Sequence, residues 1–504
     1  MVGRRALTTP LILLTAVAMA GESSAQKKKG RREATAAEEE PYYRMVSFPY
    51  DSESPLEVGA MACLKDGRLL IGTRTGDVWM LSNPYVKDTK KAEFKRWARG
   101  LAQPLGFVEY QGWIYTAQRG ELTRMKDSDG DGRADVFENV CDDWEISGNY
   151  HEYNFGPRLD KNGQMWITTN KPFGSQPLGK AHWRGWALTV DPKTGKMKPM
   201  CAGLRSPAGV EVSPWGDAFY TDNQGEWCNA SKLSHLEFGD FHGHPHGLIT
   251  KKLAGEPFAS IPEPKSGTYM KDLHKQVPSF KMPAVWLPYD KMGKSPSGMC
   301  WDTSGGKFGP FDGQLFIGDQ HHATVMRVCL EKIDGHWQGA CFRFRRDFQC
   351  GIIRICWGQD HSLFAGMSKA GWGSKGSKNW GLQRVEWTGK VPMEILSMHA
   401  KPDGFELKFT MPLDPKTAGD AARYQFESYT YKLRKNYGGP EDDKKTLKVT
   451  DVEVAKDRRS VRVKVTPLRK GYVHELYLDD LKSKDGKPIL HPWAYYTLVN
   501  IPKK

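Results

Sequence analysis

A twelve-residue acidic loop is the segment whose residue types and spacing point most directly to chemistry. Residues 127–138 read DSDGDGRADVFE, with glycine at the sixth position. EF-hand loops bind Ca²⁺ through positions 1, 3, 5, 9 and 12 and the backbone carbonyl of position 7, with a glycine at position 6 for the sharp turn. No helix pair flanks this loop, so we expect a calcium site with a structural role and not a calcium sensor. An acidic turn without an ion is the alternative. The predicted ligands are Asp127, Asp129, Asp131, Arg133, Asp135 and Glu138.

Three polar segments, at residues 147–157, 203–223 and 295–322, carry the candidate catalytic and binding residues. An imidazole titrates near neutrality and suits proton transfer, so His151 is the first candidate, with a structural histidine as the alternative. A glycine-rich lip at residues 371–376 contains an aromatic ring that could contact a ligand. We predict a catalytic role for His151, Arg205 and Asp222, and a substrate-binding role for Asn223, His321 and Trp372.

Three histidines at alternate positions, His242, His244 and His246, form a further candidate site. On an extended segment they would share one side and could bind Zn²⁺ or Cu²⁺. Pro245 makes the segment irregular, and a polar loop is the alternative.

A repeated turn-and-strand pattern must position these residues. A turn is followed by an alternating apolar strand, and successive turns lie about 45–50 residues apart, with one interval twice as long. That spacing is typical of four-stranded propeller blades. We predict an all-β protein with a six-bladed β-propeller over residues 43–390 and an insertion near 239–294. The six copies start at residues 66, 111, 162, 215, 312 and 360.

The pattern changes after residue 390. Residues 405–409, 447–454 and 461–465 alternate strictly between apolar and polar, as half-buried strands do. We predict a small Ig-like β-sandwich over residues 391–504, acting as a spacer or as a docking module for an extracellular protein partner.

The N-terminus predicts export. Residues 1–25 have the basic start, short apolar stretch and small residues of a signal peptide, followed at 26–42 by a charged linker predicted to be disordered. We therefore expect a secreted or periplasmic protein with no transmembrane segment. Nine cysteines in an oxidising compartment predict disulfides, although the spacing does not give their pairing. The absence of Cys-x-x-Cys-His excludes covalently bound haem c.

Composition excludes other classes of protein. The chain carries 73 Lys and Arg against 59 Asp and Glu, giving a net charge of +14 that is spread along the sequence. There is no basic stripe or nucleic-acid-binding module, so no nucleic-acid partner is expected. Disorder, collagen and coiled coil are also excluded by composition.

The segments around His151, around Arg205 with Asp222 and Asn223, and at residues 295–298, together with the six repeats, resemble the glucose/sorbosone dehydrogenase family. The chain is most similar to a secreted branch of planctomycete-type bacteria, here without the haem c domain. Some members oxidise sugars with pyrroloquinoline quinone and calcium.

The resemblance implies roles for particular residues. His151 matches the general base, which takes a sugar hydroxyl proton, and Arg205 matches a cofactor-contacting arginine. The asparagine that should follow Arg205 is Ser206, and the cofactor-binding lysine corresponds to His321. Arg354 lies one residue out of register with an expected arginine.

Two functions remain open after these comparisons of residues. One is a sugar or aldose dehydrogenase-like oxidoreductase with a carbohydrate or small-molecule ligand. The other is a non-catalytic extracellular scaffold that binds glycan or protein.

Overall fold

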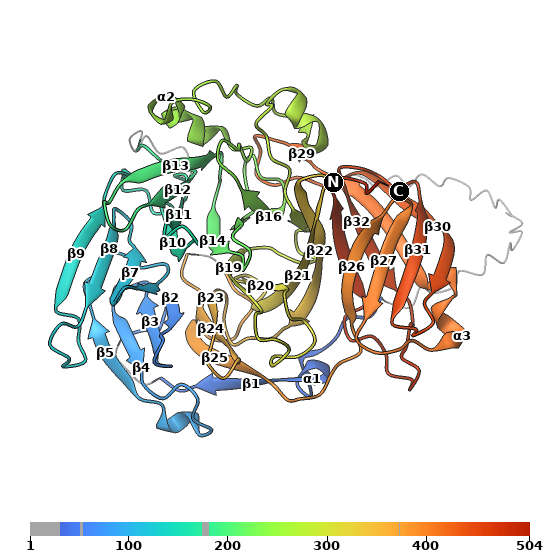
Figure 1. The fold of residues 1–504 in the computed structure, drawn as a ribbon, viewed down its shortest axis with the longest axis horizontal. Helices are drawn as coiled ribbons and strands as arrows, with labels where there is room; N and C mark the ends of the chain where they lie inside the picture. The colour runs from blue at the N-terminus through green and yellow to red at the C-terminus, as the bar shows by residue number, and fades with distance from the viewer. Residues whose placement is uncertain (1–30, 51–53, 174–180, 372, 504) are drawn as a thin grey trace, which may run out of the picture. The chain divides into compact units, whose positions relative to one another are not determined.

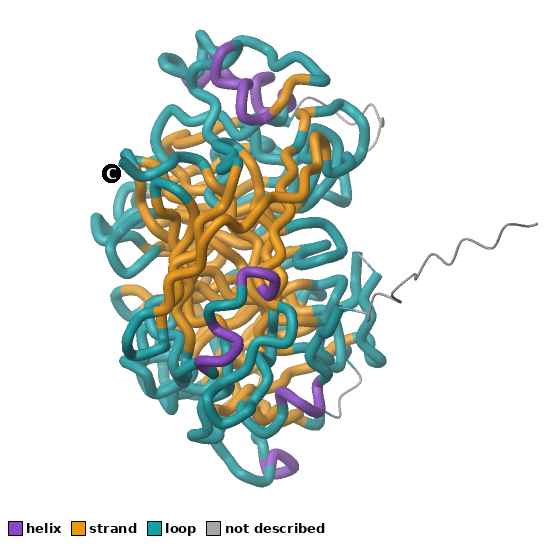
Figure 2. The backbone as a smooth tube through the Cα atoms, turned by 90° about the vertical axis from the view of Figure 1, so that its right-hand side faces the viewer, coloured by secondary structure: helices purple, strands orange, loops and turns teal. Residues whose placement is uncertain are grey.

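The computed structural model describes residues 31–50, 54–173, 181–371 and 373–503, so the predicted signal peptide at 1–25 lies outside the described residues. The described chain is all-β, with 44% strand and 6% helix. Strands make up most of the interior and the helical segments are short (Figure 2). No helix among the described residues combines the length and hydrophobicity needed to cross a membrane.

Five separate four-stranded antiparallel sheets form blades of a propeller (Figure 1). The second strands β3, β11, β15 and β24 are buried throughout, and β7 is buried after its first residue, as the continuous apolar sequence of β3 requires of a strand covered on both faces. The sheets are β2 (Val58–Cys63), β3 (Leu69–Thr73), β4 (Val78–Leu81), β5 (Phe94–Ala98); β6 (Val108–Tyr110), β7 (Trp113–Ala117), β8 (Leu122–Lys126), β9 (Val136–Cys141); β10 (Asn154–Leu159), β11 (Met165–Thr169), β12 (Trp186–Val190), β13 (Met197–Ala202); β14 (Pro207–Val212), β15 (Ala218–Asp222), β16 (Ser231–Leu236), β18 (Val285–Leu287); and β23 (Ile352–Trp357), β24 (Leu363–Ser368), β25 (Trp380–Trp387), β1 (Tyr43–Phe48).

Pairing between the two ends of the repeat region closes the ring of blades. Strand β1 runs antiparallel to β25, with Tyr43 opposite Trp387 and Phe48 opposite Leu382. The N-terminal strand thus completes the sheet formed by the last three strands of the repeat region. This pairing fastens residues 43–48 to the end of the ring (Figure 1).

The remaining predicted blade is part of a larger sheet. Strands β19 (Pro296–Trp301), β20 (Leu315–Asp319), β21 (Thr324–Ile333) and β22 (His336–Arg345) are the first four strands of an eleven-stranded sheet. Its fifth strand is β33 (Trp493–Leu498), which pairs with β22 between Gly339 and Cys341. The propeller and the C-terminal region therefore share one continuous hydrogen-bonded sheet.

The C-terminal strands fold back on that sheet. The long strand β30 pairs with β28 through residues 442–447 and with β31 through 448–454. Phe405 of β27 and Phe342 of β22 share one apolar core. The Ig-like assignment stays a prediction. The strands are β26 (Ile395–Lys401), β27 (Gly404–Phe409), β28 (Tyr424–Thr430), β29 (Lys432–Leu433), β30 (Asp442–Val454), β31 (Ser460–Thr466) and β32 (Tyr472–Leu478), with short helices α3 (Pro415–Ala418) and η4 (Ala421–Arg423).

The predicted insertion at 239–294 supplies secondary structure of its own. It contains η2 (Pro245–Thr250), α2 (Lys251–Ala254), β17 (Thr268–Tyr269) and η3 (Met270–Lys275), and it ends in β18, the fourth strand of a blade. Strand β17 pairs with β29 of the C-terminal region. The insertion is therefore connected to both the propeller and the C-terminal strands.

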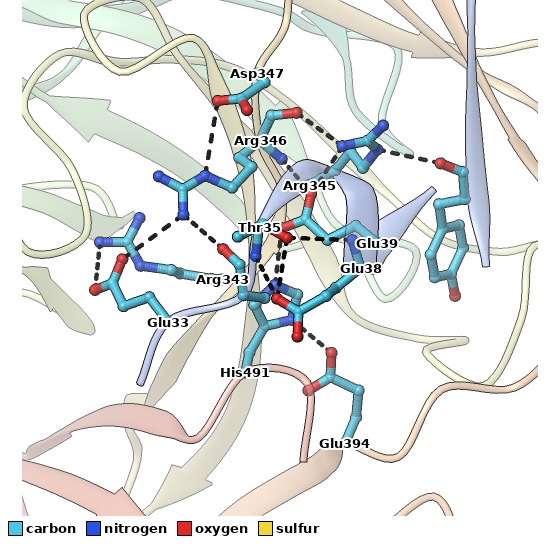
Figure 3. Close-up of polar contacts among 12 residues, drawn as sticks. Glu33, Thr35, Glu38, Glu39, Arg343, Arg345, Arg346, Asp347, Glu394 and His491 are labelled. Atoms are coloured by element: carbon cyan, nitrogen blue, oxygen red, sulfur yellow. Dashed lines mark hydrogen bonds and ion pairs between the residues drawn. The ribbon is translucent and has the colours of Figure 1, made fainter. Parts of the chain in front are cut away.

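The end of the predicted disordered linker at 26–42 is ordered. Helix α1 (Ala36–Glu39) has a capping box at Thr35, and Glu39 is 1% exposed. Glu39 binds Arg345 of β22 at 2.8 Å and His491 at 3.0 Å, and His491 also contacts Glu394 at 2.5 Å (Figure 3). Tertiary ion pairs thus overcome the low hydrophobicity on which the prediction of disorder rested.

The expected disulfides are not formed. All nine cysteines are free thiols, and Cys201, Cys341 and Cys350 are completely buried. Buried free cysteines behave as small apolar side chains. In this fold the cysteines pack within the blades and do not cross-link them.

Candidate functional site

A cavity of about 310 Å³ lies where loops of all six four-stranded sets converge. Of the described residues that line it, Arg74, Arg205 and Lys294 are cationic and none is acidic. Its volume is at the lower end of the range for small-molecule sites. Three of the predicted site residues, His151, Arg205 and Asn223, line this one cavity.

His151 is held in one tautomer at the cavity wall. Its Nδ1 lies 2.8 Å from the carbonyl oxygen of Lys171, which can only accept, so Nδ1 carries the proton. Its Nε2 lies 3.1 Å from the hydroxyl of Ser206, which donates to it. Burial, followed by the positive charge of Arg205, lowers the pKa of His151 to about 3. The imidazole is therefore a neutral hydrogen-bond acceptor at neutral pH.

Asp222 positions the Arg205 segment from below the cavity. Its carboxylate is completely buried and accepts the backbone N–H groups of Arg205 at 3.2 Å and Ser206 at 2.7 Å. Lys232 lies 3.8 Å away and balances its charge. Asp222 does not line the cavity, and in this arrangement it positions the backbone of Arg205 and Ser206, while its catalytic role stays a prediction.

Arg205 belongs to a three-residue ion network. Its guanidinium lies 3.0 Å from Glu226, and the same carboxylate contacts the amine of Lys171. Two basic groups thus share one anion. Burial, followed by the positive charge of Arg205, lowers the pKa of Lys171 to about 7, so the network carries a partial excess of positive charge at neutral pH. Arg205 itself is 4% exposed, so this charge is poorly solvated.

Arg74 is a second cationic feature that the sequence did not reveal. It donates to the carbonyl of Ala370 and to the hydroxyl of Tyr153 at 3.2 Å, while its Nε has no hydrogen-bond partner among the described residues. No carboxylate lies within ion-pair distance of Arg74 among the described residues. Below the cavity, burial and the nearby Arg158 and Arg74 lower the pKa of Arg354 to about 9. The floor of the cavity is therefore electropositive.

Arg354 packs against three residues of the cavity wall. Its guanidinium donates to the carbonyls of Leu105 at 2.8 Å and Ala208 at 2.7 Å, and it lies 4.7 Å from the ring of Phe155. Leu105, Ala208 and Phe155 all line the cavity. Arg354 therefore lies behind these lining residues and does not line the cavity itself.

Aromatic rings and amides complete the walls. Tyr150 is 56% exposed and Tyr437 is 49% exposed at the cavity, with Phe173 between the Arg205 and His151 side chains. The side-chain oxygens of Asn170 and Asn223 are buried and have no hydrogen-bond partner in the part of the chain that the structure describes. These atoms are acceptors without a donor, which a ligand or water would supply.

The C-terminal region contributes Tyr437 to this site. Its segment is fastened to the loop after β15 by hydrogen bonds from Trp227 N to the Arg434 carbonyl at 2.7 Å and from Gly438 N to the Gly225 carbonyl at 3.0 Å. The prediction that residues 391–504 act only as a spacer or docking module did not anticipate this. No motif in the sequence marks Tyr437.

One predicted substrate contact, His321, does not join the cavity lining, and another, Trp372, falls on a residue that the structure does not describe. The Nδ1 of His321 contacts the carbonyl oxygen of Gly373 at 2.9 Å.

The acidic loop brings together three of its six predicted ligands. Side-chain oxygens of Asp127, Asp129 and Asp131 lie within 4.8 Å of one another. Asp135 instead accepts a hydrogen bond from the backbone N–H of Ser128 at 2.7 Å.

Glu138 departs most from the EF-hand prediction. It pairs with Arg124 on the adjacent strand, and the loop runs into strand β9, whereas an EF-hand loop runs into a helix. The last predicted ligand is therefore carried away from the aspartates. Arg133 donates its backbone N–H to Asp131 at 2.8 Å.

The three alternate histidines do not assemble into a metal centre. Among the described residues, the three aspartates are the one group of three or more metal-binding side chains whose ligand atoms come together. His244 accepts from the backbone N–H of His246 at 3.1 Å, and His246 belongs to the turn η2. The turn at Pro245 breaks the extended geometry that a shared face would need.

Comparison with known proteins gives a fold-level similarity. A family described as "Domain of unknown function (DUF7133)" matches residues 59–277. No curated protein matches the sequence. The solved structures to which the chain is similar include glucose and aldose sugar dehydrogenase propellers, the type that the sequence resembles.

Three of these structures illustrate the similarity. A putative oxidoreductase (glucose dehydrogenase) from Thermus thermophilus has 15% identity and a TM-score of 0.48, over 68% of this chain and 99% of that one. The PQQ-bound aldose sugar dehydrogenase from Streptomyces coelicolor has 13% identity and a TM-score of 0.46, over 70% and 99%. The apo aldose sugar dehydrogenase from Escherichia coli has 16% identity and a TM-score of 0.48, over 68% and 99%.

Proposed function

We propose that the protein is a secreted or periplasmic six-bladed propeller that binds a sugar in the cavity at one end of its channel. The observation that carries this proposal is the composition of the cavity wall. Exposed tyrosine rings stand beside cationic groups and beside two buried amide oxygens that lack donors. Aromatic faces stack on sugar rings, and unpaired acceptors are suited to sugar hydroxyls.

Sugar oxidation is the second candidate, and the geometry of His151 favours it. A neutral imidazole whose Nε2 faces Ser206 can accept a proton that leaves a substrate hydroxyl, either directly or through the serine. The low pKa of His151, about 3, makes it a weak base until a ligand changes its surroundings. Sugar binding is therefore the better-supported function. Oxidation of the bound sugar is a second activity, which is tested once binding is established.

The described residues do not fit pyrroloquinoline quinone, which carries three carboxylates. Charge-assisted hydrogen bonds to three cations would be needed. Arg205 already binds Glu226 at 3.0 Å, and Lys294 binds Asp290 at 3.0 Å. Arg74 is the one lining cation without a carboxylate partner among the described residues. The proposed function therefore does not depend on a quinone cofactor.

The acidic loop is proposed to hold one Ca²⁺ through Asp127, Asp129 and Asp131. Three converging carboxylates repel one another unless a cation balances them, and oxygen donors are those that Ca²⁺ prefers. The loop joins β8 to β9 on the outer part of a blade, so the ion would stabilise that hairpin. An extracellular protein partner for the C-terminal strands remains an alternative role for the molecule.

The proposal is tested by calorimetric titration of the full exported chain with a panel of mono- and oligosaccharides. Asn223→Trp places a large ring in the cavity, whereas Asn162→Trp places one on an exposed turn outside it. We expect binding by the wild type and by Asn162→Trp, and loss of binding by Asn223→Trp. Equal binding by both variants would contradict a sugar site in the cavity. Dye reduction with the bound sugars, compared with His151→Ala, then separates oxidation from binding alone.

A further inference from the structure

We infer that the sugar bound in this cavity is acidic, with its anionic group held at Arg74. This inference rests on the proposed sugar-binding function and names the class of ligand. It starts from the charges: the lining contains Arg74, Arg205 and Lys294 and no acidic residue among those described. A neutral sugar would leave the positive charge of the cavity without a counter-charge.

The excess charge is concentrated at two places. Within the described part of the chain, Arg74 is bound only by neutral groups, the Ala370 carbonyl and the Tyr153 hydroxyl, and its buried Nε has no partner. The second is the Arg205 network, in which Lys171 and Arg205 share Glu226. Lys294, in contrast, is balanced by Asp290. The cavity thus offers one unbalanced cation, Arg74, to a ligand, and the Arg205 network adds a partial positive charge beside it.

Arg74 is oriented by contacts on two sides of the site. Its guanidinium carbon lies 5.3 Å from the centroid of the Tyr153 ring, and the hydroxyl of the same tyrosine accepts from Nη2. The planar guanidinium is suited to a carboxylate or a sulfate ester, both of which present two oxygens at the spacing of its N–H groups. Hexuronic acids and sulfated sugars share this chemistry.

The rest of the wall fits the uncharged part of such a sugar. The unpaired oxygens of Asn170 and Asn223 accept hydroxyl donors, and the exposed ring of Tyr437 offers a face for the sugar ring. An acidic monosaccharide has hydroxyls, a ring face and an anionic group. The cavity offers a partner for each: hydrogen-bond acceptors, an aromatic face and an unbalanced cation. A tricarboxylated pyrroloquinoline quinone has no ring hydroxyls and one pyrrole N–H donor, so it would leave at least one of the two amide oxygens without a donor.

The test compares matched ligands on the full chain by calorimetry. Methyl glucuronide is compared with methyl glucoside, methyl galacturonide with methyl galactoside, and glucose 6-sulfate with glucose. We expect the acidic member of at least one pair to bind about tenfold or more tightly than its neutral partner, because a charge-assisted pair in a desolvated site is strong. The glucuronide and sulfate arms show which anion the cavity prefers. Raising the salt concentration should reduce the preference.

Two variants assign the preference to Arg74. Arg74→Gln should bring the acidic and neutral sugars to equal affinity, while Arg74→Lys should retain part of the preference. Arg99→Gln, an exposed change outside the cavity, should leave it unchanged. Thermal unfolding of each variant checks that the fold is kept, and the ratio of the two affinities is independent of any fraction lost to misfolding.

The outcomes separate the two proposals. Equal affinity for acidic and neutral sugars would overturn the acidic ligand and leave sugar binding in place. Tight binding of pyrroloquinoline quinone that competes with the sugars would also overturn it, because the cations would then serve a cofactor. Binding of no sugar would overturn both proposals.

Discussion

Tyr437, from the C-terminal region, and Arg205, from the loop before β14, lie against each other at the cavity. The guanidinium carbon of Arg205 is 5.3 Å from the centroid of the Tyr437 ring. Glu226, which binds Arg205, forms an isolated β-bridge with Tyr437. The C-terminal strands therefore help to build the wall of the propeller's cavity.

Tyr437→Ala is predicted to weaken sugar binding by about threefold to tenfold, because an aromatic contact contributes roughly 1 kcal/mol. Calorimetric titration measures the change. Phe137→Ala removes a similarly exposed ring from strand β9 and serves as the matched control. Unchanged affinity in Tyr437→Ala would show that the ring does not contact the sugar.

Calcium is predicted to raise the melting temperature of the wild type, because an ion that binds only the folded state stabilises it. Asp129→Asn should abolish most of this rise, while Asp135→Asn should retain it because Asp135 is occupied by Ser128. Scanning calorimetry with calcium and with chelator measures both. Equal loss in the two variants would favour the full EF-hand ligand set.

Stability is predicted to fall at alkaline pH through His491. Burial lowers its pKa, but Glu394 and Glu39 outweigh this and raise the pKa to about 9. The folded pKa exceeds the unfolded value of about 6.5, so this stabilisation is complete below about pH 6.5 and disappears as pH rises through about 9. Melting temperatures from pH 6 to 10 test it.

His491→Gln provides the comparison for that pH profile. The variant should melt lower than the wild type at neutral pH and should lose the part of the alkaline decrease that His491 causes. A wild-type profile that is flat between pH 7 and 10, or one that is unchanged in His491→Gln, would contradict the assignment.

His151 is predicted to remain neutral in the free protein down to about pH 4, because burial and Arg205 lower its pKa to about 3. Its folded pKa lies below the unfolded value, so His151 costs stability progressively as pH falls below about 6.5. NMR titration of the imidazole carbon-bound proton measures the pKa. An anionic sugar should raise it by offsetting Arg205, and titration near pH 6.5 in the free protein would contradict the buried geometry.

The repeat and the convergence of loops were predictable from the sequence. Turn residues such as Gly67 and Gly313 adopt positive φ values of 90° and 78°, as tight turns before strands require, and His361 takes the same region at 63°. Because corresponding loops of a propeller face one end of the channel, residues near His151 and Arg205 in sequence could be expected to meet.

Other parts of the site depended on tertiary contacts that no local pattern encodes. Arg74 follows an ordinary blade strand, and Tyr437 lies in a loop whose position is set by pairing with residues 225–229. Glu138 matched an EF-hand position, but the strand β9 directs it to Arg124. Long-range pairing therefore decided the position of Tyr437, and pairing within the β8–β9 hairpin decided that of Glu138.

Hydrogen-exchange mass spectrometry with a saturating sugar tests the central claim most directly. The account predicts slower exchange at residues 149–156, 203–208 and 432–440, which surround the cavity, and no change at the exposed Trp215 turn, which lies outside the cavity lining. Protection confined to the Trp215 turn or to the C-terminal strands would contradict a sugar site in the cavity and would place binding on the outer surface.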